Sequence, residues 1–146
     1  MELSLSHCFV YVLDQDEALA FYTGALGMEP RVDAQMENMR WLTVGPPSQP
    51  DLEINLMALG PPIPPEDVEP LRELVAKGSM GAIIFTADDC RAAFERVVAA
   101  GAEIMQEPME QSYGVIDCAF RDPSGNHLRI SQHLARSGGE SVAPWG

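Results

Sequence analysis

The second half of the chain repeats the plan of the first half. Each half contains an apolar strand, an acidic helix start, a helix rich in Ala and Phe, and a Gly that ends it. Asp14 and Asp88 are 74 positions apart, and so are Gly27 and Gly101. A repeat of this length predicts two similar modules packed on each other. We therefore expect a functional site between the two modules.

The first repeat predicts the element order β-α-β-β-β. Asp14 and Glu17 form a capping box at the start of its helix, and Gly27 supplies the left-handed residue after its end. We expect Leu19, Tyr22 and Leu26 to form the apolar face of this helix. The predicted elements are strands at 3–13, 29–34, 38–44 and 52–59, with a helix that follows Asp14 to about residue 26.

The second repeat predicts the same order after a structured linker at about 60–79. This linker begins with four prolines and continues as a helix over 66–77 that ends at Gly78. We expect module one at about 3–59, module two at about 80–133, and a loose tail at 134–146, all within a single domain. The predicted elements of module two are strands at 82–87, 103–106, 115–121 and 127–133, with a helix at 89–100 and a hairpin turn at 122–126.

Charge and composition exclude several classes of partner. The chain carries 22 acidic and 9 basic residues and a formal net charge of −13. Such a charge repels phosphate backbones and anionic lipids, so we expect no nucleic-acid or membrane partner. No apolar run reaches the ~18 residues of a membrane span, and no signal peptide is visible. A cytoplasmic location follows as the expectation.

The remaining motifs do not indicate nucleophilic or phosphate chemistry. Cys8, Cys90 and Cys118 lack CxxC spacing, so we expect buried reduced thiols, with a reactive nucleophile as the alternative. No GxSxG, P-loop or GxGxxG motif is present. The acidic pairs at 66–67 and 88–89 stand at helix starts, where capping and the helix dipole explain them.

Three local motifs accompany the repeat: AFYTGALGM at 20–28, Tyr113-Gly114, and FRDPSGN at 120–126. In this order, over about residues 3–133, they resemble the vicinal oxygen chelate superfamily. That superfamily includes glyoxalase I, bleomycin-resistance proteins, fosfomycin-resistance enzymes and extradiol dioxygenases. The resemblance implies an α+β fold in which two tandem βαβββ modules curl their sheets around a central cavity, with the helices outside. It also implies a homodimer.

The resemblance further implies a divalent metal ion (Zn, Ni, Mn or Fe) that is held by residues of the first and last strands of each module. His7 matches the first-strand position of module one, and Glu53 or Asn55, which share a strand face, matches the last. In module two, these positions hold Ala82 and Arg129. Ala82 cannot coordinate a metal, and the Arg129 cation would repel one. Because two ligands are too few for a firm site, we expect no complete metal site.

Arg129 has two interpretations. If it faces the cavity, it forms a bidentate clamp for a carboxylate or phosphonate. The alternative is a salt bridge to Glu53 or Asp117. His127 is a possible substitute metal ligand on this strand, but we expect strand alternation to point it away from Arg129.

The candidate site also contains aromatic residues. Phe9 and Tyr11 share a strand face with His7 by alternation, and Trp41 is expected to join them. Ordinary core packing is the alternative for these aromatics. Tyr113 stands at a strand entrance, where the family closes its pocket, and a plain turn is the alternative. The predicted substrate-binding residues are Phe9, Tyr11, Trp41, Asn55, Tyr113 and Arg129, with His7 and Glu53 as catalytic or metal-ligating candidates.

Three functions fit these features. The favoured one is a protein that binds a small organic molecule, such as an antibiotic, without the family's full metal site. The alternative is a metal-dependent lyase, isomerase or dioxygenase of the glyoxalase type, in which His7 and Glu53 act as ligands or base. The third is a subunit whose dimer surface matters more than its pocket.

Overall fold

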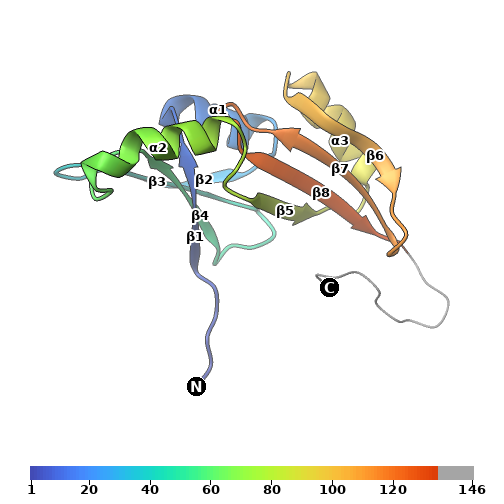
Figure 1. Cartoon of the computed structure of the whole chain (residues 1–146). Coiled ribbons are helices and arrows are strands. Elements are labelled where there is room, and N and C mark those ends of the chain that lie inside the picture. Colours follow the sequence, from blue (N-terminus) through green and yellow to red (C-terminus); the bar gives the residue numbers. More distant parts are fainter. Residues whose placement is uncertain (135–146) are drawn as a thin grey trace. The chain divides into compact units, whose positions relative to one another are not determined.

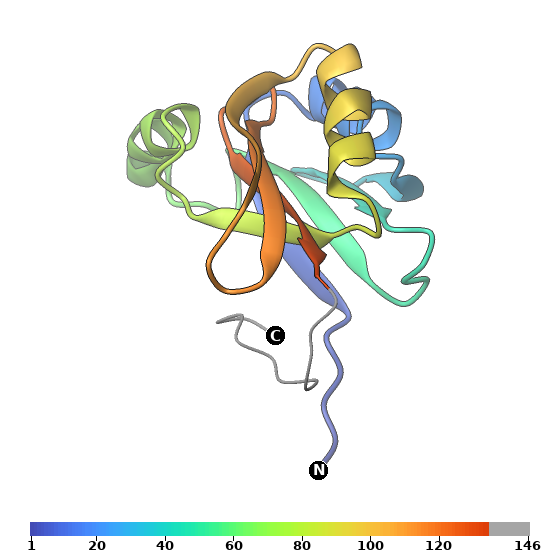
Figure 2. The same ribbon diagram turned by 90° about the vertical axis from the view of Figure 1, so that its right-hand side faces the viewer.

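The computed structural model describes residues 1–134, so the predicted loose tail lies almost entirely outside the described residues. The described chain forms two compact units, each with one four-stranded sheet and its own helices (Figure 1 and Figure 2). The two sheets and the repeated element order confirm the predicted α+β class with two tandem βαβββ modules. Unit 1 contains Met1–Met80 and Pro123–Asn126, and unit 2 contains Gly81–Asp122 and the described residues from His127 onward.

Unit 1 is built on a sheet with the strand order β1-β4-β3-β2. β1 runs parallel to β4, and the other neighbours are antiparallel. Helix α1 packs on one face of this sheet, where alternate strand residues such as Val12, Leu42 and Leu56 are fully buried. The elements of unit 1 are β1 (His7–Val12), α1 (Gln15–Gly24), β2 (Glu29–Gln35), β3 (Arg40–Gly45), β4 (Glu53–Ala58) and α2 (Pro65–Ala76).

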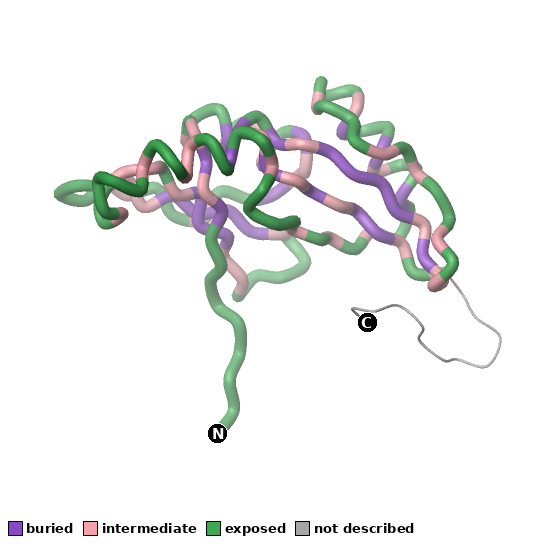
Figure 3. The backbone as a smooth tube through the Cα atoms, viewed as in Figure 1, coloured by how far each residue is buried: buried purple, intermediate pink, exposed green. Residues whose placement is uncertain are grey.

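Unit 2 repeats this arrangement with the strand order β5-β8-β7-β6. β5 is parallel to β8, and helix α3 packs on one sheet face through Phe94, whose ring lies 5.5 Å from that of Phe120. Figure 3 shows a long buried stretch in the central strand β7, whereas buried and half-buried residues alternate along much of β8. The elements of unit 2 are β5 (Ala82–Thr86), α3 (Cys90–Ala99), β6 (Glu103–Glu110), β7 (Val115–Arg121) and β8 (His127–His133).

Helices α1 and α3 begin with matching caps. Asp14 accepts a hydrogen bond from the Glu17 backbone N–H at 2.9 Å, and Asp89 accepts one from the Ala92 N–H at 3.0 Å. The N-cap of α3 is therefore Asp89, one residue after the Asp88 that the 74-residue spacing aligns with Asp14. Each helix has 10 residues. The first repeat therefore has one more residue than the second between the end of its helix and the glycine that follows, Gly27 or Gly101.

The predicted elements differ from the structure in several further places. β1 begins at His7 rather than at residue 3, β3 begins at Arg40, and β6 extends four residues beyond its predicted end. Helix α1 ends at Gly24, and it buries Ala18 and Tyr22 while Leu19 and Leu26 stay partly exposed. The hairpin of β7 and β8 has the predicted bounds.

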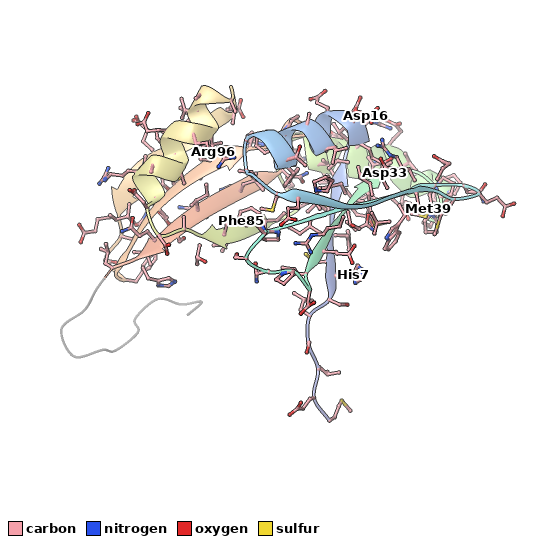
Figure 4. All side chains as sticks on the ribbon, turned by 180° about the vertical axis from the view of Figure 1, so that it is seen from behind. His7, Asp16, Asp33, Met39, Phe85 and Arg96 are labelled. Atoms are coloured by element: carbon pink, nitrogen blue, oxygen red, sulfur yellow. The ribbon has the colours of Figure 1, made fainter. Side chains whose placement is uncertain are left out.

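Arg40 connects the start of α1 to the edge of the unit 1 sheet. Its guanidinium donates to both carboxylate oxygens of Asp33 at 2.8 and 2.9 Å, and to Asp16 at 2.7 Å. Figure 4 labels the two carboxylate residues on their neighbouring elements. The hydrogen bonds from Arg40 hold the pKa of Asp33 below its usual value. Because both carboxylates are exposed, this network adds little to stability.

The turn Pro123–Asn126 belongs to unit 1, although it joins two strands of unit 2. The Leu13 N–H donates to Ser124 Oγ at 2.8 Å, and Asn126 Nδ2 donates to the Tyr11 carbonyl at 2.8 Å. Gly125 has φ +108°, and a Cβ there would lie 2.8 Å from the Val75 carbonyl oxygen. The DPSGN motif thus fits against β1 and α2.

No helix within residues 1–134 is long and apolar enough to cross a membrane. Cys90 and Cys118 are buried free thiols, as expected, whereas Cys8 is exposed, so the expectation of burial was wrong for that residue.

Candidate functional site

Most of the predicted site residues lie on the face of the unit 1 sheet that points away from α1. His7 pairs with Glu53, and Phe9 pairs with Asn55, in the parallel register of β1 and β4. Thr43 of β3 pairs with Asn55 from the other side. These residues alternate with the buried residues of the α1 face, so their side chains share the opposite face. Figure 4 shows His7 at the beginning of β1.

His7, Glu53 and Thr43 form a connected polar group on this face. His7 Nε2 lies 3.3 Å from Glu53 Oε2, and Thr43 Oγ1 donates to Glu53 Oε1 at 2.6 Å. Thr43 Oγ1 also accepts from the Val32 N–H at 3.1 Å. On the solvent side, His7 Nδ1 lies 2.9 Å from Ser6 Oγ. The His7 side chain is 46 % exposed, so it can exchange a proton or a hydrogen bond with a bound molecule.

Asn55 occupies the centre of this face and is only 3 % exposed. Its Oδ1 atom has no hydrogen-bond partner among residues 1–134. The Trp41 and His7 rings lie near each other, with centroids 6.3 Å apart. Phe9 remains 57 % exposed, and its ring makes an edge contact with Tyr11 at 5.0 Å. The structure therefore brings His7, Glu53, Asn55 and the three predicted aromatics onto one sheet face.

Arg129 of unit 2 forms the salt bridge to Asp117 that the sequence offered as an alternative. Its Nη2 lies 2.9 Å from Asp117 Oδ2 and 3.0 Å from Gln106 Oε1. The Asp117 side chain is fully buried, and Gln106 and Gln111 donate to its Oδ1 at 2.8 and 2.9 Å. Burial opposes the charge of Asp117, but the hydrogen bonds from Gln111, Arg129 and Gln106 outweigh it and hold its pKa below the usual value. The carboxylate therefore stays ionised inside the unit.

Further polar groups stand beside Arg129 on β8. The expectation that His127 points away from Arg129 was wrong, because residues two apart on a strand share a face. His127 Nε2 and Ser131 Oγ are both buried without a hydrogen-bond partner among the described residues. Burial is the main cause that lowers the pKa of His127, and the positive charges of Arg129 and Arg121 lower it further. Tyr113 lies in the turn between β6 and β7 and is half-buried, which fits a turn residue.

Sequence reasoning did not single out Thr43, Gln106 or Ser131. The polar alternation at 127, 129 and 131 is visible in the sequence and could have indicated a polar face on β8. Gln106, Gln111 and Thr43 gave no such signal in the sequence, because their roles depend on contacts across strands.

The strand registers show which residues of the two repeats correspond. Asn55 and Arg129 each pair with the third residue of the neighbouring parallel strand, whereas Glu53 and His127 each pair with the first. Asn55 is therefore the counterpart of Arg129, and Glu53 is the counterpart of His127. This assigns the register that the sequence left open between Glu53 and Asn55.

Unit 1 supplies two donors for a metal site of the implied kind, His7 and Glu53. In unit 2, Ala82 supplies none, and the last strand holds His127 as the counterpart of Glu53 and Arg129 as the counterpart of Asn55. Among residues 1–134, no group of three or more His, Cys, Asp and Glu side chains could hold a metal ion. The observed geometry instead offers an acid–base pair and a buried amide beside exposed aromatic surface.

Comparisons with known proteins agree with this fold. UcmS2, a protein of known structure, has 41 % sequence identity and a TM-score of 0.83, over 90 % of this chain and 98 % of its own. TnmS3, an antibiotic binding protein from Streptomyces sp. CB03234, has 27 % identity and a TM-score of 0.72, over 91 % of this chain and 98 % of its own. YurT, an uncharacterized protein of Bacillus subtilis (strain 168), is 32 % identical over 123 residues, which cover 84 % of this chain and 94 % of YurT.

The family model for the Glyoxalase/Bleomycin resistance protein/Dioxygenase superfamily matches residues 4–130, which confirms the resemblance inferred from the motifs. The chain belongs to the glyoxalase/bleomycin resistance protein/dioxygenase superfamily.

Proposed function

We propose that this protein binds a small aromatic organic molecule of the antibiotic class and holds it without converting it. The observation that carries the proposal is the open face of the unit 1 sheet, where Phe9 is 57 % exposed beside polar groups. Small-molecule sites are lined mainly by apolar and aromatic side chains with a few placed polar groups, and this face supplies both kinds of group. The 27 % identity to TnmS3, an antibiotic binding protein, supports the same ligand class.

Titration with doxorubicin tests this proposal, because that antibiotic is planar, carries hydrogen-bond donors and reports binding through its own fluorescence. We expect saturable binding with one molecule per chain, and recovery of chemically unchanged doxorubicin. Phe9→Ala and Trp41→Ala should each weaken binding about tenfold, since each removes a large aromatic contact. Ile104→Ala, at an exposed apolar position of unit 2, is the control and should leave binding unchanged. Equal binding by all of these variants would contradict the proposal.

The second candidate function is a metal-dependent lyase, isomerase or dioxygenase of the glyoxalase type. The contact of His7 Nε2 with Glu53 Oε2 at 3.3 Å favours it, because Thr43 orients the carboxylate toward an imidazole that can move a proton. Metal analysis of protein purified without chelator separates the two functions. Near-stoichiometric Zn, Ni, Mn or Fe that is lost in His7→Ala would support the enzyme and overturn metal-free binding.

We further propose that the protein acts as a homodimer in the cytoplasm. β1 and β5 are edge strands of their sheets, and β5 exposes Ile84. Edge strands of this kind offer unpaired backbone groups and apolar surface to a partner. Light scattering during gel filtration should give twice the chain mass of 15.9 kDa. A mass of one chain at micromolar concentration would contradict the dimer.

A further inference from the structure

We infer that Asn55 selects the ligand by accepting a hydrogen bond from a hydroxyl or amine on its aromatic ring system. This inference rests on the proposed function, because it assigns a ligand class to the same sheet face. It adds the chemical group that the ligand must carry and the atom of the protein that detects it.

The state of the Asn55 side chain is the first observation. Asn55 is 97 % buried, and its Oδ1 has no hydrogen-bond partner among the described residues. Buried polar atoms are nearly always paired, because an unpaired one loses its water without compensation. Thr43, its partner across the strands, is fully buried and both donates and accepts a hydrogen bond. The fold thus satisfies the neighbouring polar group and leaves the amide oxygen available.

The position of the two nearby rings is the second observation. His7 lies on β1 and Trp41 lies on β3, with β4 between them. Neighbouring strands are about 4.8 Å apart, so β1 and β3 are separated by about 9.6 Å. The ring centroids are only 6.3 Å apart, so the two side chains lean toward each other over β4. They therefore lie above the strand that carries Asn55. For a planar ligand to reach the amide, the Trp41 side chain must move aside.

The third observation is the polarity of the surrounding groups. On this side of β4, Glu53 carries a carboxylate and Asn55 an unpaired amide oxygen, and the chain carries a net charge of −13. An acceptor-rich surface favours ligands that donate hydrogen bonds and disfavours anions. Phe9 supplies exposed ring surface on the adjacent strand. The fitting ligand is a neutral or cationic planar aromatic molecule with an O–H or N–H group.

A matched pair of probes tests this inference. 2-Naphthol carries a hydroxyl donor, whereas 2-methoxynaphthalene has the same rings and oxygen without the donor. Calorimetric titration gives the affinity of each probe for wild type and for Asn55→Leu, which keeps the side-chain size and removes the amide. We expect the affinity ratio of 2-naphthol to 2-methoxynaphthalene to fall about three- to tenfold in Asn55→Leu, the effect of one hydrogen bond. The melting temperature should stay the same or rise, because an unpaired buried group is removed.

Ser131→Ala is the control variant. Ser131 is fully buried and has an unpaired Oγ, but its register partners Thr86 and Asp117 are not aromatic. This variant should keep the wild-type affinity ratio. If Asn55→Leu does not fold, Asn55→Ala replaces it with the same expected fall in the ratio.

The outcomes separate the inference from the proposed function. If wild type binds both probes and the ratio is unchanged in the Asn55 variant, the inference is overturned and aromatic binding remains. If wild type binds neither probe at millimolar concentration, aromatic binding on this face and the inference are both overturned. A ratio that falls equally in Ser131→Ala also overturns the inference, because the effect would then not be specific to Asn55.

Discussion

At the scale of single residues, two buried polar side chains, Asp117 and Asn55, differ in how their hydrogen-bonding groups are satisfied. Asp117 is fully buried and accepts hydrogen bonds from Arg129, Gln106 and Gln111. Asn55 is almost as deeply buried, yet its oxygen has no partner among the described residues. The first arrangement stabilises the fold, whereas the second leaves bonding capacity for a ligand.

Arg129→Met should lower the free energy of unfolding by about 3 kcal/mol, because it leaves the buried Asp117 carboxylate without its cation. The remaining donors Gln106 and Gln111 keep the loss at the lower end of the usual range. Urea unfolding at pH 7 measures the change. The double variant Arg129→Met/Asp117→Asn should recover most of it, and a single-variant loss below about 1 kcal/mol would contradict the structure.

The pKa of Asp117 predicts how stability depends on pH. Its folded-state pKa lies below the unfolded value of 3.8. The stability that the charged Asp117 contributes is therefore fully present above about pH 5, and it is lost as the pH falls through the folded pKa. Asp117→Asn lacks this dependence, so its stability difference from wild type should shrink below pH 4. Unfolding titrations from pH 7 to pH 2 check this, and a difference independent of pH would count against it.

The cysteines should differ in reactivity. Burial, and to a smaller extent the neighbouring Cys90, raises the pKa of Cys118 to about 12. The sulfur atoms of Cys90 and Cys118 lie 3.6 Å apart. Since the thiolate is the reactive form, both buried thiols should resist iodoacetamide at pH 8. Partial burial of its sulfur also raises the pKa of Cys8, so this thiol should react slowly. Because Cys8 is exposed and the other two cysteines are buried, it should still react before them. Mass spectrometry should show one adduct on native protein, and rapid early labelling of Cys118 would contradict this.

At the scale of elements, helix caps and the last hairpin are predictable because their signals are local. The cap formed by Asp14 and the hairpin turn formed by DPSGN each depend on a few consecutive residues, and both form where the sequence predicts them. The end of β6 was missed because two register shifts interrupt its pairing with β7 and break the alternation. The sequence placed both Asp88 and Asp89 at the start of α3, because either position can cap a helix, and the structure assigns the cap to Asp89.

The helix caps give a direct comparison of neighbouring residues. Asp89→Ala should destabilise the protein by about 1 kcal/mol, because the Ala92 N–H loses its acceptor. Asp14→Ala should cost a similar amount at α1. Asp88→Ala is the matched control, since this exposed residue precedes the cap, and it should change stability little. Thermal unfolding of the three variants measures these changes in stability. A larger loss for Asp88→Ala than for Asp89→Ala would indicate that Asp88, 74 positions after Asp14, is the cap of α3.

The candidate site was predicted only in part. His7 and Glu53 followed from the family resemblance, and the structure places them 3.3 Å apart. The difference between Glu53 and Asn55 needed the pairing of β1 with β4, since alternation puts both on one face. The partner of Arg129 likewise depended on which strand lies beside β8. Contacts across strands join residues far apart in sequence, and no local pattern reports them.

At the scale of the whole molecule, the turn Pro123–Asn126 is the feature that the repeat did not indicate. It continues the strands of unit 2 but is held by Tyr11, Leu13 and the end of α2 in unit 1. Gly125 is required there for two reasons, its positive φ and its contact with the carbonyls of Val75 and Ala76.

Gly125→Ala should destabilise the protein by more than Gly101→Ala does. Both glycines have positive φ, which costs an alanine about 1–3 kcal/mol. Nothing lies within 4 Å of a Cβ at Gly101, whereas a Cβ at Gly125 would meet the Val75 carbonyl oxygen at 2.8 Å. The difference between the two variants in chemical denaturation therefore reports the close approach alone. Equal losses would show that the turn is not held as described.

The position of this turn has a consequence for where the chain can be divided. Unit 1 consists of Met1–Met80 together with Pro123–Asn126. A fragment that ends at Met80 therefore lacks the hydroxyl that accepts from the Leu13 N–H and the amide that donates to the Tyr11 carbonyl. The first half of the sequence is consequently not the same thing as the first folded unit.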